Sequence, residues 1–419
     1  MSTTQNIDTA ITRRITTTLF ITKSLHSTAL VGLLTVTPII AVNLTGNDIA
    51  VGLPATLVLI GRAIAAYPIG WLMDRLGRRT GLNVGFLVAI FGMSLSAIAV
   101  VNGILWLFLS GSFFLGMSRS AVEQMRFIAA EVQPEGRRAH AIGLIAFSST
   151  IGSLSGSLLM DTSPNLTVLI GIPILAIPFV LAVVLMFIGL LLNQLFLHPD
   201  PLDVSRKLEA SNTQTETKQV GSARSMRQIF VQYEVILAAS VMAISWLGMT
   251  VVMQVTPLHM NYEGYQVPTI SRAVMIHSLG MFAFSSVTGW LTSSIGRLPV
   301  VAIGIVLLII AGICGCFAQT LITLYIAVFL LGVGWNFCYI AGSAMLSDQL
   351  QSEERGRAQG VSEAFIGVTA AIGSVTSGFV YASYGYMGSN LIVIGSSVLL
   401  FIIFALLSKP NIQTSGTAS

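Results

Sequence analysis

Long apolar runs alternate with short polar connections along almost the whole chain. Twelve of these runs reach about the 20 residues that an α-helix needs to cross a bilayer, so the pattern predicts an all-α membrane protein. A polar segment before the first run is expected to be a short cytoplasmic tail. The predicted helices cover residues 20–43, 49–72, 80–101, 104–130, 138–160, 166–192, 231–257, 267–291, 299–318, 321–347, 357–382 and 387–408.

The pattern occurs twice along the chain. GWLMDRLGRR at residues 70–79 returns 219 residues later as GWLTSSIGR at 289–297, and the segment 131–143 returns 217 residues later at 348–360. Two homologous bundles predict pseudo-symmetric six-helix halves with a solute path along the seam between them. The sequence therefore favours a transporter.

The longest polar connection divides the two copies. Its composition is polar and low in aromatic residues, which is typical of a segment that buries little apolar surface. We therefore expect a first six-helix half at 1–192, a cytoplasmic linker at 193–229 and a second six-helix half at 230–419.

Composition supports the membrane assignment and excludes other classes. Charged residues make up 9% of the chain, against roughly 25% in an average soluble domain, and hydrophobic residues make up 54%. The three cysteines lie inside apolar runs, so no disulfide framework is expected. There is no Walker loop, G-x-S-x-G elbow or zinc-protease motif, so neither an enzyme nor a resident cofactor is expected. No nucleic-acid partner is expected either.

Basic residues predict the orientation. The loops around 43–48, 102, 161–165, 260–266, 319 and 383–388 contain no Lys or Arg. By the positive-inside rule, both termini and the linker are cytoplasmic, and the protein is expected in the inner (plasma) membrane as a multi-pass monomer. The basic residues on the other side are Arg75, Arg78, Arg79, Arg137, Arg138, Arg206, Lys207, Lys218, Arg224, Arg227, Arg297, Arg355 and Arg357.

The loop at 70–79 has a separate role for each polar or small residue. Gly70 is expected to let its helix approach a neighbour closely, Asp74 to pair with a basic group and Gly77 to permit a tight turn. Arg78 and Arg79 are expected to anchor the helix end at the membrane surface.

This loop resembles the signature loop of the major facilitator superfamily, G-x-x-x-D-x-x-G-R-[RK], at every position. The resemblance covers about residues 18–408. It implies two six-helix halves that rock around a central site, with the loop as a conformational latch. Candidate partners for the latch are Arg355, Arg357 and Glu363; alternatively, these charges only set the topology.

Four charged residues fall deep inside predicted helices, where ionisable groups are costly and often functional. Arg62 lies in the second helix, while Arg119, Glu123 and Arg126 are spaced to share one face of the fourth. Arg119, Glu123 and Arg126 form either a structural ion network or a site for a proton or an anionic substrate. Lys23 and His26, near the start of the first predicted helix, are expected at the membrane interface, because a lysine side chain can extend to the headgroups.

Methionine and histidine mark the seventh and eighth helices. Met249 and Met253 are four residues apart, as are His277 and Met281, so each pair shares a helical face. Thioether and imidazole ligands suit Cu(I) better than harder ions. The alternative is that the methionines fill gaps between helices and the histidine hydrogen-bonds across a helix pair.

The same four residues resemble the proposed ligands of the copper-importing branch that supplies bacterial cytochrome oxidase assembly. That resemblance makes copper import by a secondary transporter the leading prediction, with copper as substrate and the lipid bilayer as surroundings. The alternative is a proton-coupled transporter of an organic solute, for drug efflux or for a vitamin such as riboflavin. A sugar or anion carrier and a non-transporting sensor or scaffold are less favoured.

Overall fold

The computed structural model describes residues 2–133, 138–212, 224–350 and 355–407, and every regular element among them is helical. The first elements are α1 (Ser2–Thr45), η1 (Asp48–Gly52), α2 (Leu53–Leu76), α3 (Arg78–Asn102), α4 (Leu105–Glu123), α5 (Met125–Glu131), α6 (Arg138–Met160), α7 (Ser163–Ile170) and α8 (Ile177–Phe196). They are followed by α9 (Pro201–Asn212), α10 (Met226–Phe230), α11 (Tyr233–Tyr262), α12 (Val267–Phe282), α13 (Ser285–Ser294), α14 (Arg297–Cys316), α15 (Leu321–Asp348) and α16 (Arg355–Leu407).

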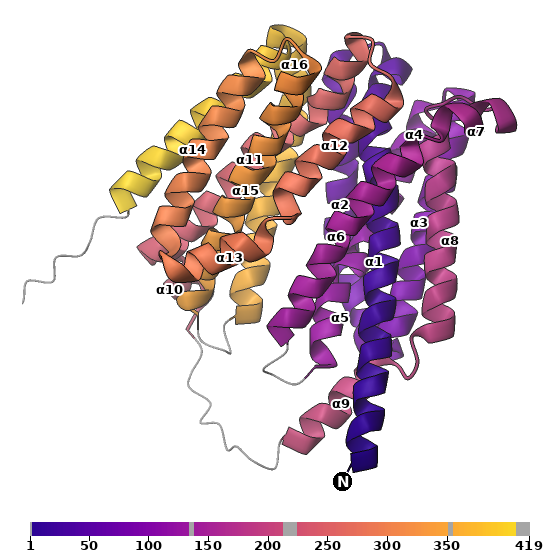
Figure 1. The fold of residues 1–419 in the computed structure, drawn as a ribbon, viewed down its shortest axis with the longest axis vertical. Coiled ribbons are helices and arrows are strands. Elements are labelled where there is room, and N and C mark those ends of the chain that lie inside the picture. The colour runs from indigo at the N-terminus through magenta and orange to yellow at the C-terminus, as the bar shows by residue number, and fades with distance from the viewer. Residues whose placement is uncertain (1, 134–137, 213–223, 351–354, 408–419) are drawn as a thin grey trace, which may run out of the picture.

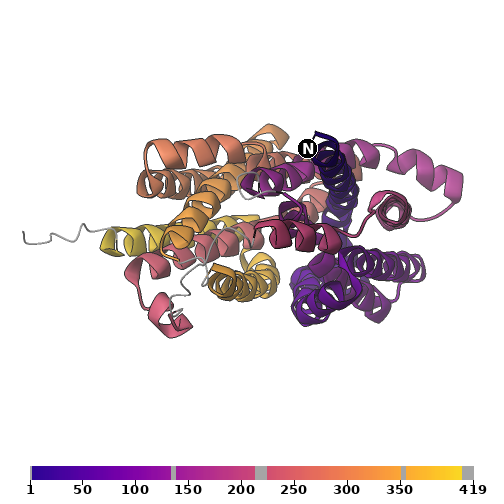
Figure 2. The same cartoon turned by 90° about the horizontal axis from the view of Figure 1, so that it is seen from below.

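The predicted set of membrane helices is confirmed. Eleven helical stretches among the described residues are long and apolar enough to cross a bilayer. The last, Ala364–Leu407, has 44 residues and is interrupted by non-helical backbone at Gly385, so it accounts for two of the twelve. Figure 1 and Figure 2 show the helices before and after the linker as two bundles lying side by side.

Several predicted boundaries were wrong for local reasons. Helix α1 begins at Ser2, so the expected polar tail is helical, because nothing before Pro38 interrupts it. The sixth predicted helix is two elements, α7 and α8, because Gly171 adopts a φ of +74° and Pro173 follows it. The fourth breaks at Gln124 between α4 and α5, and the eighth breaks between α12 and α13.

The predicted linker contains regular structure at both of its ends. It includes the end of α8, all of α9, all but the last residue of α10, and a connection at 213–223 that lies outside the described residues. Asp200, just before α9, accepts hydrogen bonds from the backbone nitrogens of Arg78 (3.0 Å) and Arg79 (3.1 Å) at the start of α3. The linker thus caps a helix of the first half, and the exact domain boundaries stay a prediction.

Each half has its own apolar core. Phe86 and Phe108 are fully buried in the first, and Trp335 is 3% exposed in the second. Large apolar side chains also cover the outside; Val168 on α7 and Ile322 on α15 are examples. Such exposure would destabilise a protein in water, but it matches the hydrocarbon of a bilayer.

The halves meet at one end of the molecule. We call the end that carries Gly77 and Gly296 the arginine-rich end, and the other the opposite end. At the opposite end, Arg272 pairs with Asp161 at 2.9 Å, and the Tyr262 hydroxyl donates to Asp48 at 2.5 Å. Both interactions join one half to the other. In Figure 1 the bundles diverge toward the end that carries the N-terminus, which is the arginine-rich end.

Two glycines make this seam tight. Ser374 on α16 donates a hydrogen bond of 2.9 Å to the carbonyl of Gly52, at the end of η1. A Cβ added at Gly52 would lie 2.7 Å from the carbonyl carbon of Ser374, and one at Gly378 would lie 2.8 Å from that of Ile49. The backbones of the two halves are therefore in direct contact here, and only glycine fits at both positions.

Candidate substrate site

A carboxylate shared by two guanidinium groups lies in the middle of the first half. Arg62 on α2 contacts Glu123 on α4 at 2.7 Å, and Arg119, one turn earlier on α4, contacts the other oxygen at 3.3 Å. Arg62 is at the midpoint of the span Asp48–Leu76, and Arg119 is next to the midpoint of Leu105–Glu131. All three side chains are between 24% and 31% exposed. The structure thus brings Arg62, Arg119 and Glu123 together.

Three more basic side chains surround this group. Arg126 interacts electrostatically with Glu123, although it lies on the separate helix α5 rather than on one continuous face with Arg119. The sequence interpretation placed Lys23 of α1 and the nearby His26 at the membrane interface. That interpretation was wrong: Lys23 interacts with Glu123, Arg119 and Arg126, and His26 is 3% exposed.

Charge in this cluster is unbalanced. Glu123 is the one carboxylate acting on Lys23, Arg62, Arg119 and Arg126 within the described part of the chain, so the five groups sum to +3. Placing an arginine or lysine at the centre of a membrane helix costs roughly 2.5–3.5 kcal/mol on insertion scales. Because two or more of these cations lack a matching acid, stability alone does not explain their presence.

The methionine and histidine residues lie in the second half, but no described contact joins their sulfur and nitrogen atoms. Met249 is 8% exposed in the apolar core, and Met253 and Met281 pack against that core. His277 is 4% exposed, and its Nδ1 lies 2.9 Å from the Val328 carbonyl oxygen. These contacts match the alternative in which the methionines fill gaps between helices and the histidine hydrogen-bonds across a helix pair.

An aromatic cluster occupies the middle of the second half, and the sequence interpretation missed it. Trp335 on α15 lies 4.8 Å from Tyr339 with the rings 13° from parallel, and 5.0 Å from Trp246 on α11 at 73°. Phe282 on α12 completes the group at 6.1 Å from Trp335. Trp335 and Trp246 are 89 positions apart, so helical spacing could not join them; both lie near the midpoints of their spans.

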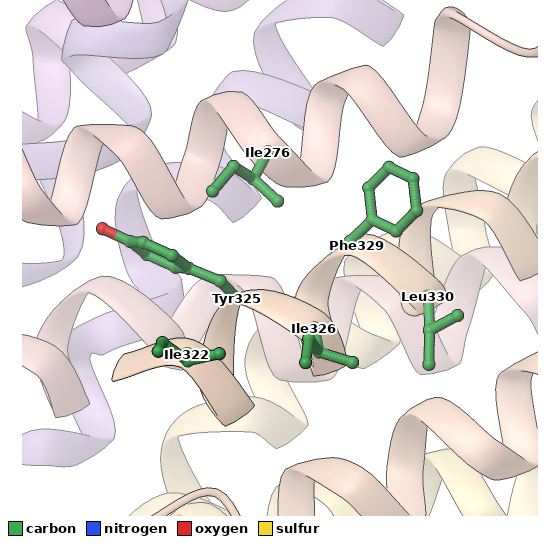
Figure 3. Close-up of a pocket in the computed structure, with 6 residues that line it drawn as sticks. All are labelled: Ile276, Ile322, Tyr325, Ile326, Phe329 and Leu330. Atoms are coloured by element: carbon green, nitrogen blue, oxygen red, sulfur yellow. The ribbon is translucent and has the colours of Figure 1, made fainter. Parts of the chain in front are cut away.

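A separate apolar pocket lies between α12 and α15, with a volume of about 280 Å³. Figure 3 shows its lining: Ile276, Ile322, Tyr325, Ile326, Phe329 and Leu330. The Tyr325 hydroxyl already donates to the Thr269 carbonyl at 3.0 Å. The lining therefore offers no free polar group to orient a solute, and we do not assign the substrate site to it.

The signature loop forms an ion network at the arginine-rich end. Arg78 contacts Asp74 at 2.6 Å and Glu131 at 3.0 Å. Gly77 adopts a φ of +98°, as a tight turn requires. The close approach expected at Gly70 is wrong, because a Cβ there would meet nothing within 4 Å.

Arg79 also belongs to this network. Its guanidinium donates hydrogen bonds to Gln194 on α8, so it braces neighbouring helices of its own half. The anchoring of Arg78 and Arg79 at the membrane surface stays a prediction, as does the latch. The side chains of its candidate partners Arg355, Arg357 and Glu363 lie outside the described residues.

The sequence repeat extends to the ion pairs. Arg297 contacts Asp348 at 2.8 Å in the second half, in the same relation as Arg78 to Glu131 in the first. Gly296 before it has a φ of +92°, like Gly77. Residues 19–271 and 238–418 both match the sequence profile of the Major Facilitator Superfamily. The chain belongs to this superfamily.

Relatives within the superfamily align over most of their length. The protein is 31% identical over 361 residues to the MFS-type transporter YdeG of Bacillus subtilis (strain 168), covering 85% of this chain and 83% of YdeG. It is 26% identical over 373 residues to the riboflavin transporter RfnT of Brucella anthropi, covering 88% of this chain and 89% of RfnT.

Solved structures agree on the superfamily fold. The nucleoside transporter NupG superposes with a TM-score of 0.66 at 16% identity, covering 95% of this chain and 100% of NupG. A D-xylose-proton symporter superposes with a TM-score of 0.68 at 15% identity, covering 93% and 97%. As a superfamily member, the protein is a secondary transporter of a small solute, built from two six-helix halves.

Proposed function

We propose that this protein moves a planar organic solute across the membrane by alternating access, and that riboflavin is the first solute to test. The observation that carries the proposal is the similarity to the riboflavin transporter RfnT, at 26% identity over 88% of this chain. In transporters built from repeats, the solute binds near the middle of the bilayer at the repeat interface. The charged and aromatic clusters are both at that depth.

The aromatic cluster supports a planar solute. Trp246 and Tyr339 are partly exposed, whereas Trp335 behind them is buried. Offset or edge-on contacts between rings 4.5–7 Å apart stabilise by about 0.5–1.5 kcal/mol beyond area burial. The indole nitrogen of Trp335 is buried without a hydrogen-bond partner among the described residues, so it offers a donor to a solute carbonyl.

Proton coupling is part of the proposal, with Glu123 as the candidate group. Arg62 and Arg119 both stabilise its ionised form in the described conformation. Glu123 would therefore take up a proton only in a conformation that separates it from these two guanidinium groups. The shorter of its two ion pairs, to Arg62 at 2.7 Å, is the first that such a conformation must break.

Copper import, predicted from the methionine and histidine spacing, has no support from the relatives named above. His277 and Met249 already make packing and hydrogen-bond contacts that account for their burial. Copper stays a prediction, and we place it behind the organic solute. It is tested in the same experiment by adding Cu(I) in place of riboflavin.

The test uses purified protein in liposomes, with riboflavin followed by its own fluorescence. We expect counterflow of riboflavin above that of protein-free liposomes, and a raised KM in Trp335→Leu. Trp290→Leu is the matched control, because Trp290 is 66% exposed on α13 and outside the cluster.

The proposal would be refuted if the protein transported neither riboflavin nor any other planar dye. Transport of Cu(I) that is lost in His277→Ala, without riboflavin transport, would favour the copper prediction instead.

A further inference from the structure

The basic cluster of the first half has more positive charge than its own contacts use. Arg62 and Arg119 each contact one oxygen of the Glu123 carboxylate, and no third ion pair to Glu123 is formed among the described residues. Lys23 and Arg126 act on the same carboxylate only from a distance and have no ion pair of their own within the described residues. Two cations are therefore free to bind something else.

Buried polar atoms at the same place also lack partners. The Nε2 of His26 has no hydrogen-bond partner although the residue is 3% exposed, and the Nε of Arg126 is likewise buried and unpaired. The Arg126 guanidinium rests over the Phe127 ring at 4.7 Å, which leaves its charge unneutralised. Buried donors of this kind are rare in proteins unless a ligand or water satisfies them.

The helices that carry the cluster also pack against the other half. Lys23 and His26 lie on α1, which packs against α11 and α12, and Arg62 lies on α2, which packs against α16. Arg126 lies five residues from the end of its span, whereas Arg62 and Arg119 lie at or next to the midpoints of theirs, about 15 Å from either surface of the hydrocarbon. Side chains that are a quarter exposed at this depth must open to a water-filled path, because lipid would not solvate them.

We infer that Lys23, Arg126 and His26 bind an acidic group, carboxylate or phosphate, on an organic anion that uses the solute path. Arg62, Arg119 and Glu123 hold the surrounding helices in place. The inference rests on the proposed function only in taking the seam as that path. An anion here would supply a hydrogen-bond acceptor to Arg126 and offset part of the charge of +3.

The experiment compares two probes that differ by one acidic group. Riboflavin and riboflavin 5′-phosphate are titrated against the purified full-length protein at constant ionic strength, with tryptophan fluorescence as the readout. We expect the phosphate to bind about tenfold more tightly, as one charge-assisted hydrogen bond provides. Lys23→Gln and Arg126→Gln should each abolish this preference. Lys207→Gln, on the exposed face of α9, should keep it.

A second readout separates binding from a structural role. Because Lys23 and Arg126 repel their neighbours, neutralising either should leave the melting temperature of the ligand-free protein unchanged or raised. A marked drop in both variants would mean that these cations hold the fold together, and would overturn the inference. Binding of benzoate is also compared with binding of benzamide, which is its neutral counterpart. This pair has a smaller ring, so the result does not depend on whether the flavin ring fits the site.

The outcomes distinguish this inference from the proposed function. If riboflavin is transported but neither acidic probe is preferred over its neutral counterpart, the anion site is wrong and the proposed function stands. If an acidic probe binds through Lys23 and Arg126 while riboflavin is neither bound nor moved, the anion site stands and the flavin proposal is wrong.

Discussion

The tight seam at the opposite end predicts that a single methyl group will shift the conformational balance. In Gly378→Ala, the new Cβ would lie 2.8 Å from the carbonyl carbon and 3.0 Å from the Cα of Ile49, and closer still to the oxygen. Backbone atoms cannot rotate away, so one half must move. Overpacking of this size costs about 1–3 kcal/mol. The cost applies only to the conformation in which the seam is closed.

The matched control is Gly395→Ala on the same helix, where the added Cβ meets nothing within 4 Å. Replacing glycine by alanine in a helix gains up to about 1 kcal/mol at either position, so this gain cancels in the comparison. The remaining 1–3 kcal/mol corresponds to a change of roughly 5- to 150-fold in the ratio of open to closed seams.

The assay uses Ala273→Cys as a reporter, in protein whose three native cysteines are replaced. Ala273 is fully buried on α12, in an apolar cluster with Ile39 of the other half, so a thiol there is reached only when the seam opens. We expect maleimide to label the reporter about 5- to 150-fold faster with Gly378→Ala than with Gly395→Ala. Equal rates, with full labelling after denaturation, would refute the reasoning.

Three further predictions follow from single contacts. Glu123→Gln leaves two guanidinium groups unpaired and should cost about 2 kcal/mol in thermal stability, between the values for exposed and buried pairs; unchanged stability with lost pH dependence of transport would mark it as the proton carrier. Gly77→Ala should destabilise by about 1–2 kcal/mol because its φ is +98°, whereas Gly70→Ala should not lower the melting temperature. A double-mutant cycle of Asp161→Asn and Arg272→Gln should give a coupling below about 1 kcal/mol, since both groups are more than a third exposed; a larger value would make this pair the main closure of the seam.

The spans and the repeat could be predicted from the sequence because each depends on local pattern. A run of about 20 apolar residues is sufficient to define a membrane helix. The turn at Gly77 and its copy at Gly296 follow from a motif in which only glycine adopts the required backbone. The pairing of Arg78 with Glu131 was not predicted, but once it is observed, the two shifts account for the pairing of Arg297 with Asp348, because repeated segments fold alike.

The contacts between residues distant in sequence could not be predicted, because they depend on which helix faces pack against each other in the folded protein. Arg272 sits in the first turns of an apolar helix, and its partner Asp161 is 111 residues away on a connection of the other half. Lys23 near the start of a predicted span looked interfacial, because α1 was expected to begin at residue 20 rather than at Ser2. The packing of α1 brings Lys23 close to Glu123 and Arg119, which helical spacing does not reveal.

The two halves differ at corresponding positions near the middle of their spans. Arg62 and Arg119 correspond, by the shifts of 219 and 217 residues, to Met281 and Asn336. In the second half, Asn336 bridges the same pair of helices without charge, donating to the Met281 carbonyl at 2.6 Å. At this depth the first half therefore carries the charged cluster, and the second half carries the aromatic cluster. A solute with distinct acidic and aromatic ends would bind in one orientation only. When the halves move relative to each other, each half would then act on one end of the solute.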